Sequence, residues 1–110
     1  MTFDEYQNLA LSTAIYPKEY GTIYPALGLC GKTGEVTEKI KKSIRNSVPA
    51  EQRDSFREDM IKELGDVLWY VAVLANDLNI PLDDVAENNI QKGPIYRGLD
   101  IYPEIKVMTQ

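Results

Sequence analysis

The sequence of 110 residues contains no histidine and a single cysteine, Cys30. Without histidine, the chain has no Ser-His or Cys-His nucleophile pair, no imidazole base and no imidazole metal ligand. One cysteine excludes an intrachain disulfide and favours a reducing, cytoplasmic setting. Any hydrolysis of a substrate would therefore depend on carboxylates, lysines, tyrosines or a metal ion.

Long apolar runs and an excess of positive charge are also missing. The apolar stretch at 67–75 is far too short to span a bilayer, which takes about 20 residues, and the N-terminal residues show no signal peptide. The formal net charge is −5, which argues against a nucleic-acid polymer as partner. We expect one soluble domain that binds neither membranes nor nucleic-acid polymers.

The first helix is expected to open at Thr2, because Thr2 and Glu5 have the spacing of a capping box, and to end before Pro17. Residues 16–25 contain three tyrosines, two prolines and a glycine, a composition typical of a loop. This loop is either a plain connection between helices or an aromatic cover for a flat ligand such as a nucleobase.

The second helix has two possible starting points. Gly28, Gly31 and Gly34 would each cost roughly 1 kcal/mol inside a helix, which favours a start near Thr33. Alternatively the helix runs through from Pro25, and the glycines give clearance to a neighbouring helix or ligand. We favour the second interpretation. The predicted core stripe of this helix consists of Leu29, Val36, Ile40 and Ile44.

A long central helix is expected from about 55–58 to Leu78, and it becomes apolar on every side at 67–75. A helix that is apolar all round must be buried. Yet Glu63 and Asp66 lie at the entrance to this segment and share a stripe with Tyr70. Two carboxylates that approach a core need a positive partner, because an unpaired buried charge is very costly.

Glu35 and Glu38 form a second carboxylate pair at i, i+3. Alone, such a pair is usually a solvated helix face that pairs with lysines at i+3 and i+4. If the two helices pack together, however, four carboxylates gather around one centre. Oxygen-only ligands of this kind suit Mg²⁺ or Mn²⁺, whereas zinc prefers nitrogen or sulfur, and magnesium sites commonly act on phosphates.

The last helix is expected to begin at 79–84, with a buried stripe of Leu82, Val85 and Ala86. Asn89 falls on this stripe, and Lys92 lies beside it. Asn89 is either a satisfied amide or, together with Lys92, part of a binding site for an anion.

From about residue 93 the sequence shows no strong period. We expect an extended arm there that packs on another subunit, with Arg97 as a further candidate phosphate contact.

Three segments in this order resemble the MazG-like, all-α nucleoside triphosphate pyrophosphohydrolases: residues 28–42 with the ExxE pair, 63–70 with the ExxD pair and 85–92 with Asn-x-x-Lys. The resemblance implies an all-α fold, with a single domain at 1–110 whose four-helix bundle is completed in a homodimer or homotetramer. It also implies a Mg²⁺-dependent enzyme, in which Mn²⁺ can substitute. The substrate would be an NTP or dNTP, cleaved by a metal-activated water to the monophosphate and pyrophosphate.

The resemblance further implies roles for individual residues. Tyr70 would lie beside the nucleotide, and Glu38 is our first candidate for the proton acceptor. Asn89 and Lys92 would contact the sugar or the phosphates. The sequence after Lys92 departs from the family pattern, so the resemblance does not extend to Arg97, which stays a candidate from the residues alone. The implied catalytic residues and metal ligands are Glu35, Glu38, Glu63 and Asp66.

Lys32 departs from the family pattern, which commonly has glutamate at this position. The reversed charge supports an alternative function, a catalytically weakened regulatory or scaffold protein that binds nucleotide and Mg²⁺. A di-iron carboxylate bundle is disfavoured, because its Glu-x-x-His ligands are missing.

Overall fold

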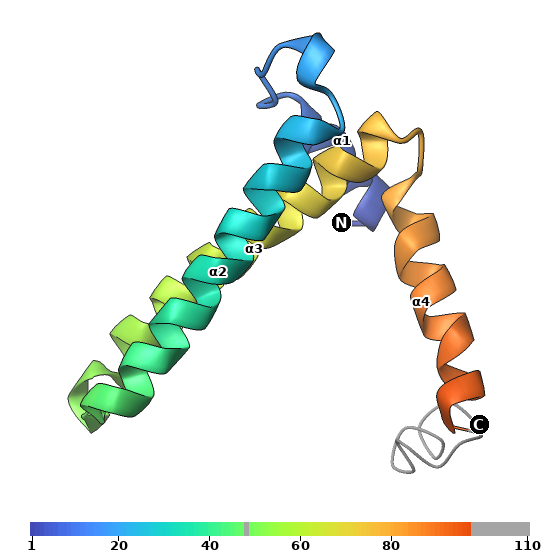
Figure 1. Cartoon of the computed structure of the whole chain (residues 1–110). Helices are drawn as coiled ribbons and strands as arrows, with labels where there is room; N and C mark the ends of the chain where they lie inside the picture. The colour runs from blue at the N-terminus through green and yellow to red at the C-terminus, as the bar shows by residue number, and fades with distance from the viewer. Residues whose placement is uncertain (48, 98–110) are drawn as a thin grey trace.

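The computed structural model describes residues 1–47 and 49–97. Two long helices, α2 and α3, run side by side in opposite directions, and α4 leaves the end of the pair that lies beside α1 as a separate arm (Figure 1). The all-α prediction is therefore confirmed. The elements in chain order are α1 (Phe3–Leu11), the single 3₁₀ turn η1 (Lys18–Tyr20), α2 (Ile23–Asn46), the 3₁₀ turn η2 (Ala50–Gln52), α3 (Arg53–Asp77) and α4 (Leu82–Arg97).

The start of α1 confirms the predicted cap. The Oγ1 of Thr2 accepts a hydrogen bond from the backbone N–H of Glu5 at 3.0 Å. This bond satisfies one of the amide groups that a helix leaves unpaired at its N-terminus.

The structure supports the clearance interpretation of α2, which begins at Ile23 and continues through the glycines. A Cβ atom on Gly28 would lie 2.1 Å from Cε1 of Tyr70 on α3, so only glycine fits beneath this ring. A Cβ on Gly31 or Gly34 would meet no described atom within 4 Å. One of the three glycines therefore provides the close approach of the two helices.

The predicted core stripe of α2 is wrong at its C-terminal end. Ile40 and Ile44 are 43% and 75% exposed, whereas Lys32 and Lys39 are partly buried against α3. The apolar period of a helix identifies its apolar face, but here a different, partly charged face packs on α3. The isoleucines remain uncovered in the single chain.

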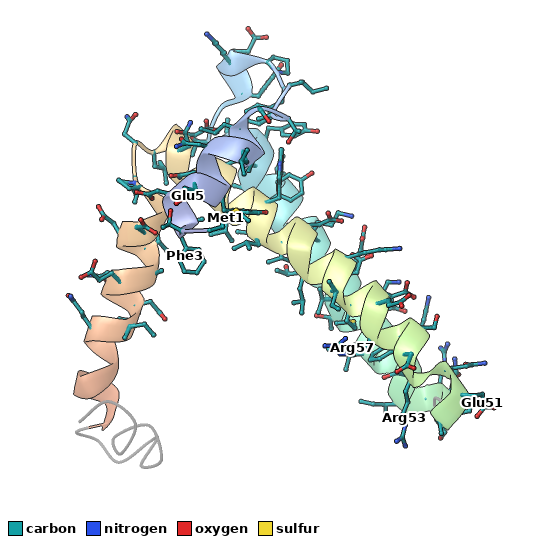
Figure 2. All side chains as sticks on the ribbon, turned by 180° about the vertical axis from the view of Figure 1, so that it is seen from behind. Met1, Phe3, Glu5, Glu51, Arg53 and Arg57 are labelled. Atoms are coloured by element: carbon teal, nitrogen blue, oxygen red, sulfur yellow. The ribbon has the colours of Figure 1, made fainter. Side chains whose placement is uncertain are left out.

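The tip of the α2–α3 pair is polar, and its far end is apolar. Seen from behind, the tip carries Glu51 and Arg53 on η2 and the start of α3 (Figure 2). At the far end, Ala72 and Val73 of the predicted buried segment have no exposed surface. They form a small core with Ala10 and Leu82.

Gln7 joins three elements at this core and is itself only 6% exposed. Its Nε2 donates to the carbonyl oxygens of Ala72 at 3.0 Å and Ile80 at 3.1 Å. Its Oε1 accepts from the N–H of Leu82 at 3.0 Å. The buried amide is thereby satisfied, and it ties α1 to α3 and to the first turn of α4.

Asp4 and Asp83 join the starts of α1 and α4 reciprocally. The N–H of Asp83 donates to Oδ1 of Asp4 at 2.9 Å, and the N–H of Asp4 donates to Oδ1 of Asp83 at 3.3 Å. Each carboxylate lies at the positive end of the other's helix, where a negative charge is favourable.

The structure of α4 differs from the expectation in two respects. Val85 is 39% exposed rather than buried, although Leu82 is buried as predicted. The helix also continues through Pro94 to Arg97, where we expected an irregular arm from about 93. The rest of the expected arm lies outside the described residues. None of the described helices is long and apolar enough to cross a membrane.

Candidate metal centre between α2 and α3

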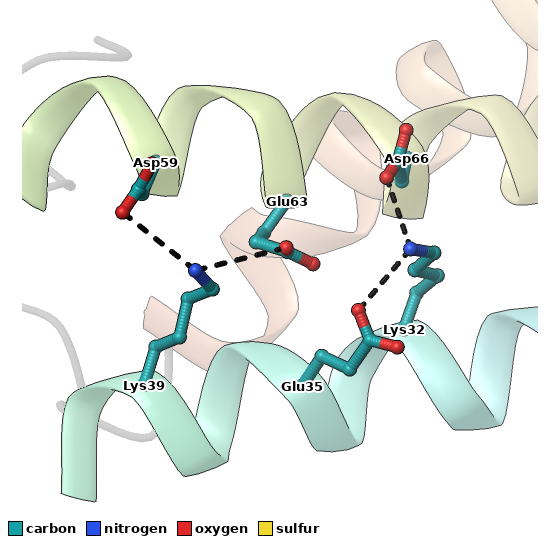
Figure 3. Close-up of polar contacts among 6 residues, drawn as sticks. All are labelled: Lys32, Glu35, Lys39, Asp59, Glu63 and Asp66. Carbon is teal, nitrogen blue, oxygen red and sulfur yellow. Dashed lines mark hydrogen bonds and ion pairs between the residues drawn. The ribbon is translucent and has the colours of Figure 1, made fainter. Parts of the chain in front are cut away.

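Charged side chains from α2 and α3 meet along the contact between the two helices (Figure 3). Lys32 and Lys39 are two helical turns apart on α2, while the α3 acids follow one another at i, i+4 and i+7. We call this group the charged seam; its members are Lys32, Glu35, Lys39, Asp59, Glu63 and Asp66.

Lys32 bridges the two helices at one end of the charged seam. Its Nζ lies 3.1 Å from Oδ2 of Asp66 on α3 and 3.1 Å from Oε2 of Glu35 on α2. Bonds between ionised groups favour the charged forms. Accordingly, the hydrogen bond to Asp66 raises the pKa of Lys32, and the hydrogen bond from Lys32 lowers the pKa of Glu35.

Lys39, two helical turns after Lys32 on α2, makes longer contacts in the charged seam. Its Nζ lies 3.7 Å from Oδ2 of Asp59 and 4.0 Å from Oε1 of Glu63. The Glu63 side chain is only 16% exposed, and its buried Oε2 has no hydrogen-bond partner among the described residues. A buried carboxylate oxygen without a donor is costly, so it is a strong acceptor for an incoming cation.

Glu38 is held by lysines of its own helix. Its carboxylate lies 3.0 Å from Nζ of Lys41 and 3.9 Å from Nζ of Lys42, as predicted for i+3 and i+4 pairs. The hydrogen bond from Lys41 lowers the pKa of Glu38. The structure thus brings Glu35, Glu63 and Asp66 to one seam, while Glu38 is engaged elsewhere on α2.

The donor chemistry of the charged seam fits a hard divalent cation. Its ligands are carboxylate oxygens only, and four carboxylates against two ammonium groups leave a net formal charge of −2. Within residues 1–47 and 49–97, however, no three acidic or cysteine side chains form a ready-made metal cage. The carboxylates would have to turn from the lysines towards the ion.

Two tyrosines lie near the end of the charged seam that Lys32 occupies. Tyr70 packs over Gly28 and meets the ring of Trp69 edge-on, with 5.0 Å between centroids. On α1, burial raises the pKa of Tyr6, and the charge of Asp66 adds to this effect. Tyr6 was not predicted as a site residue, because nothing in the sequence places α1 beside Asp66.

The candidate phosphate contacts lie on α4, away from the charged seam. Asn89 and Lys92 line one pocket with Ile80 and Val85, and no member of the charged seam lines it. The backbone of Arg97 belongs to α4, and its side chain lies outside the described part of the structure. The single chain therefore does not bring Asn89 and Lys92 to the carboxylates of the charged seam.

Lys39 and Asp59 are members of the charged seam that sequence reasoning missed as site residues. Asp59 precedes Glu63 by one turn, so the stripe through Glu63 and Asp66 could have been extended to it. Lys39 was expected to pair along its own helix, because the sequence does not reveal which residues of α3 it faces.

Together, the fold and the charged seam define an all-α protein with a carboxylate-rich charged cluster between two antiparallel helices. The sequence model of the MazG nucleotide pyrophosphohydrolase domain matches residues 25–94, which include both acid pairs. The chain therefore belongs to the MazG nucleotide pyrophosphohydrolase family, as its motifs predicted.

One relative extends the similarity beyond the matched domain. The chain is 41% identical over 98 residues to the Gene 37 protein of Mycobacterium phage L5, an alignment that covers 84% of this chain and 85% of that protein. No solved structure matches the chain.

Proposed function

We propose that the chain is a Mg²⁺-dependent nucleoside triphosphate pyrophosphohydrolase of the cytoplasm. It would cleave an NTP or dNTP to the monophosphate and pyrophosphate, with Mn²⁺ as a possible substitute. Membership of the family supports the reaction class. The observation that carries the site is the buried Oε2 of Glu63, which has no hydrogen-bond partner among the described residues, at the seam that also holds Glu35 and Asp66.

The proposed metal ligands are Glu35, Glu38, Glu63 and Asp66. Glu38 would join the other three by leaving Lys41, an exposed and therefore weak ion pair. The hydrogen bond from Lys41 lowers the pKa of Glu38, so Glu38 is a weaker proton acceptor than we expected from the sequence as long as this contact is kept.

When bound, the ion would supply charge neutralisation at the phosphates and a water molecule of lowered pKa. The carboxylates of the seam would hold the ion at a fixed place between the two helices. Tyr70, which already packs over Gly28 beside this seam, would position the nucleoside.

Asn89, Lys92 and Arg97 are the proposed contacts to the sugar or phosphates. Because α4 stands apart from the charged seam, we propose that a second copy supplies these residues in a homodimer or homotetramer. Uncovered apolar side chains on the α2–α3 pair support such an assembly. They include Leu27, Ile40, Ile44, Ile61 and Leu64, each at least 43% exposed.

Pyrophosphate release from a panel of NTPs and dNTPs, with Mg²⁺, with Mn²⁺ and with chelator, tests this proposal. We expect metal-dependent release with the monophosphate as co-product. Absence of release across the panel, from protein whose circular dichroism shows it to be helical, would overturn the proposed activity.

A second candidate function follows from Lys32, whose ammonium engages two of the proposed ligands. In that version the chain is a regulatory or scaffold protein that binds nucleotide and Mg²⁺ with little or no turnover. Nucleotide binding without pyrophosphate release would favour it. Restored release in the Lys32→Glu variant would then identify Lys32 as the cause.

A further inference from the structure

Lys32 holds the tightest contacts of the charged seam. Both of its distances, to Glu35 and to Asp66, are 3.1 Å, whereas those of Lys39 are 3.7 and 4.0 Å. Its side chain is 29% exposed, so water only partly screens the interaction. The Lys32 ammonium therefore already lies between Glu35, from the acid pair of α2, and Asp66, from the acid pair of α3.

The formal charge of the seam matches one divalent ion in the absence of substrate. The four carboxylates and two ammonium groups leave a charge of −2. One divalent cation would neutralise it, and a second would leave an excess of positive charge beside the Lys32 ammonium. Like charges a few ångströms apart repel strongly in a partly buried site.

The geometry also separates the two places where a cation can be held. Lys32 engages Glu35 and Asp66, whereas the unpartnered oxygen belongs to Glu63. A single ion at Glu63 can take the second oxygens of Glu35 and Asp66, because Lys32 contacts only Oε2 of Glu35 and Oδ2 of Asp66. A second ion centred on Glu35 and Asp66 requires the Lys32 ammonium to leave.

We propose that Lys32 is a built-in cation that takes the place of a second divalent ion and limits the site to one metal per chain. This inference rests on the proposed function, because it assumes that the charged seam binds metal. Lys32 acts here as a positioning residue, which holds Glu35 and Asp66 in place of an ion.

The test is a Mn²⁺ titration of the full chain without nucleotide, in which electron paramagnetic resonance measures the free ion. We expect the wild type to bind about one Mn²⁺ per chain and Lys32→Glu to bind about two, as in two-metal sites. Lys32→Met should bind Mn²⁺ about tenfold more tightly, because no ammonium competes. Lys62→Met, which removes an exposed lysine of α3, is the control for net charge and should match the wild type.

Thermal unfolding provides a readout that does not depend on activity. In chelator, Lys32→Glu should unfold at a lower temperature than the wild type, because Glu35 and Asp66 then face a third carboxylate. Added Mn²⁺ should restore its melting temperature. The neutral Lys32→Met variant should show the same trend with a smaller shift.

The outcomes separate this inference from the proposed function. Two Mn²⁺ ions bound with Lys32 intact would overturn the inference and leave the metal-dependent activity standing. Wild-type stoichiometry and affinity in both Lys32 variants would also overturn it. Absence of Mn²⁺ binding in every variant would overturn the metal site and thus the proposed function.

Discussion

Two regions of the molecule differ in how completely their buried polar groups are hydrogen-bonded. We call the junction of α1, α3 and α4 around Gln7 the corner. At the corner, all three hydrogen bonds of the Gln7 amide are 3.0–3.1 Å long. In the charged seam, the contacts extend to 4.0 Å, and Oε2 of Glu63 has no partner among the described residues.

This difference separates a region that stabilises the fold from a region that we propose to bind a metal ion. A satisfied buried amide rigidifies the fold, whereas a carboxylate without a donor lowers stability until a ligand binds. The four predictions that follow test this contrast, from the largest expected effect to the smallest.

The largest effect is expected from Glu63→Gln. It removes the negative charge at the unpartnered oxygen, so pyrophosphate release should fall by at least about a thousandfold, or ~4 kcal/mol in the activation free energy. Asp66→Asn should behave similarly. Circular dichroism should stay that of the wild type, because the one ion pair of Glu63 among the described residues, with Lys39, is loose at 4.0 Å.

Glu58→Gln is the matched control, since Glu58 is an exposed acid of the same helix. Its activity should equal that of the wild type. Full activity in either Glu63→Gln or Asp66→Asn would disprove the metal assignment.

Gln7→Leu should cause the largest loss of stability. It leaves the carbonyl oxygens of Ala72 and Ile80 and the N–H of Leu82 without the partner they have now, so the free energy of unfolding should fall by about 3 kcal/mol. Urea denaturation measures this change.

The exposed Gln91 of α4 is the control position for Gln7, with a single side-chain bond to Glu87. Gln91→Leu should alter the free energy of unfolding by less than about 0.5 kcal/mol. Equal effects of the two substitutions would contradict the structural role of the Gln7 amide.

Gly28→Ala should destabilise the chain by about 2 kcal/mol, because the new methyl group forces the Tyr70 ring out of its place. Gly31→Ala, where the methyl group meets open space, should instead stabilise the same helix by up to about 1 kcal/mol. Thermal unfolding compares the two. Changes of the same sign would mean that α2 and α3 do not approach most closely at Gly28.

The smallest effect concerns pH. Lys32 lowers the pKa of Glu35 below the value of about 4.3 that glutamate has in an unfolded chain. This contribution to stability is present above pH ~4.3 and is lost as the pH falls through the lowered pKa. It is small, because Glu35 is exposed.

Lys32→Met should therefore lose less stability on acidification than the wild type. Urea midpoints measured from pH 6 to pH 3 would show a shallower decline, and Lys62→Met should follow the wild type. If the urea midpoints of the wild type and of Lys32→Met declined in parallel with falling pH, Lys32 would not be lowering the pKa of Glu35.

Local signals in the sequence were sufficient to predict the helices. The cap at Thr2 fixed the start of α1, and α3 ends at Asp77, next to its predicted end at Leu78. The sequence left two possible starts for α2, at Pro25 or near Thr33, because the free-energy cost of a glycine in a helix depends on what packs against it. Tyr70 supplies that contact at Gly28.

The register between helices could not be predicted. The spacing of the two acid pairs indicated that all four carboxylates could meet. Glu35, Glu63 and Asp66 do lie on one seam, whereas Glu38 pairs with lysines of its own helix. We could not deduce which lysine pairs with the acids of α3. Lys32 meets Asp66 because of how α2 packs on α3, and the pattern of either helix alone does not reveal this packing. The exposure of Ile40 has the same origin.

The reciprocal bond between Asp4 and Asp83 has a consequence for the order of folding. The two residues are 79 positions apart, so α1 finds this partner only when nearly all the described chain has been synthesised. The α2–α3 pair, in contrast, closes through the short connection around η2, and closing a short loop costs little entropy. We therefore expect the α2–α3 contacts to form before the corner closes during folding.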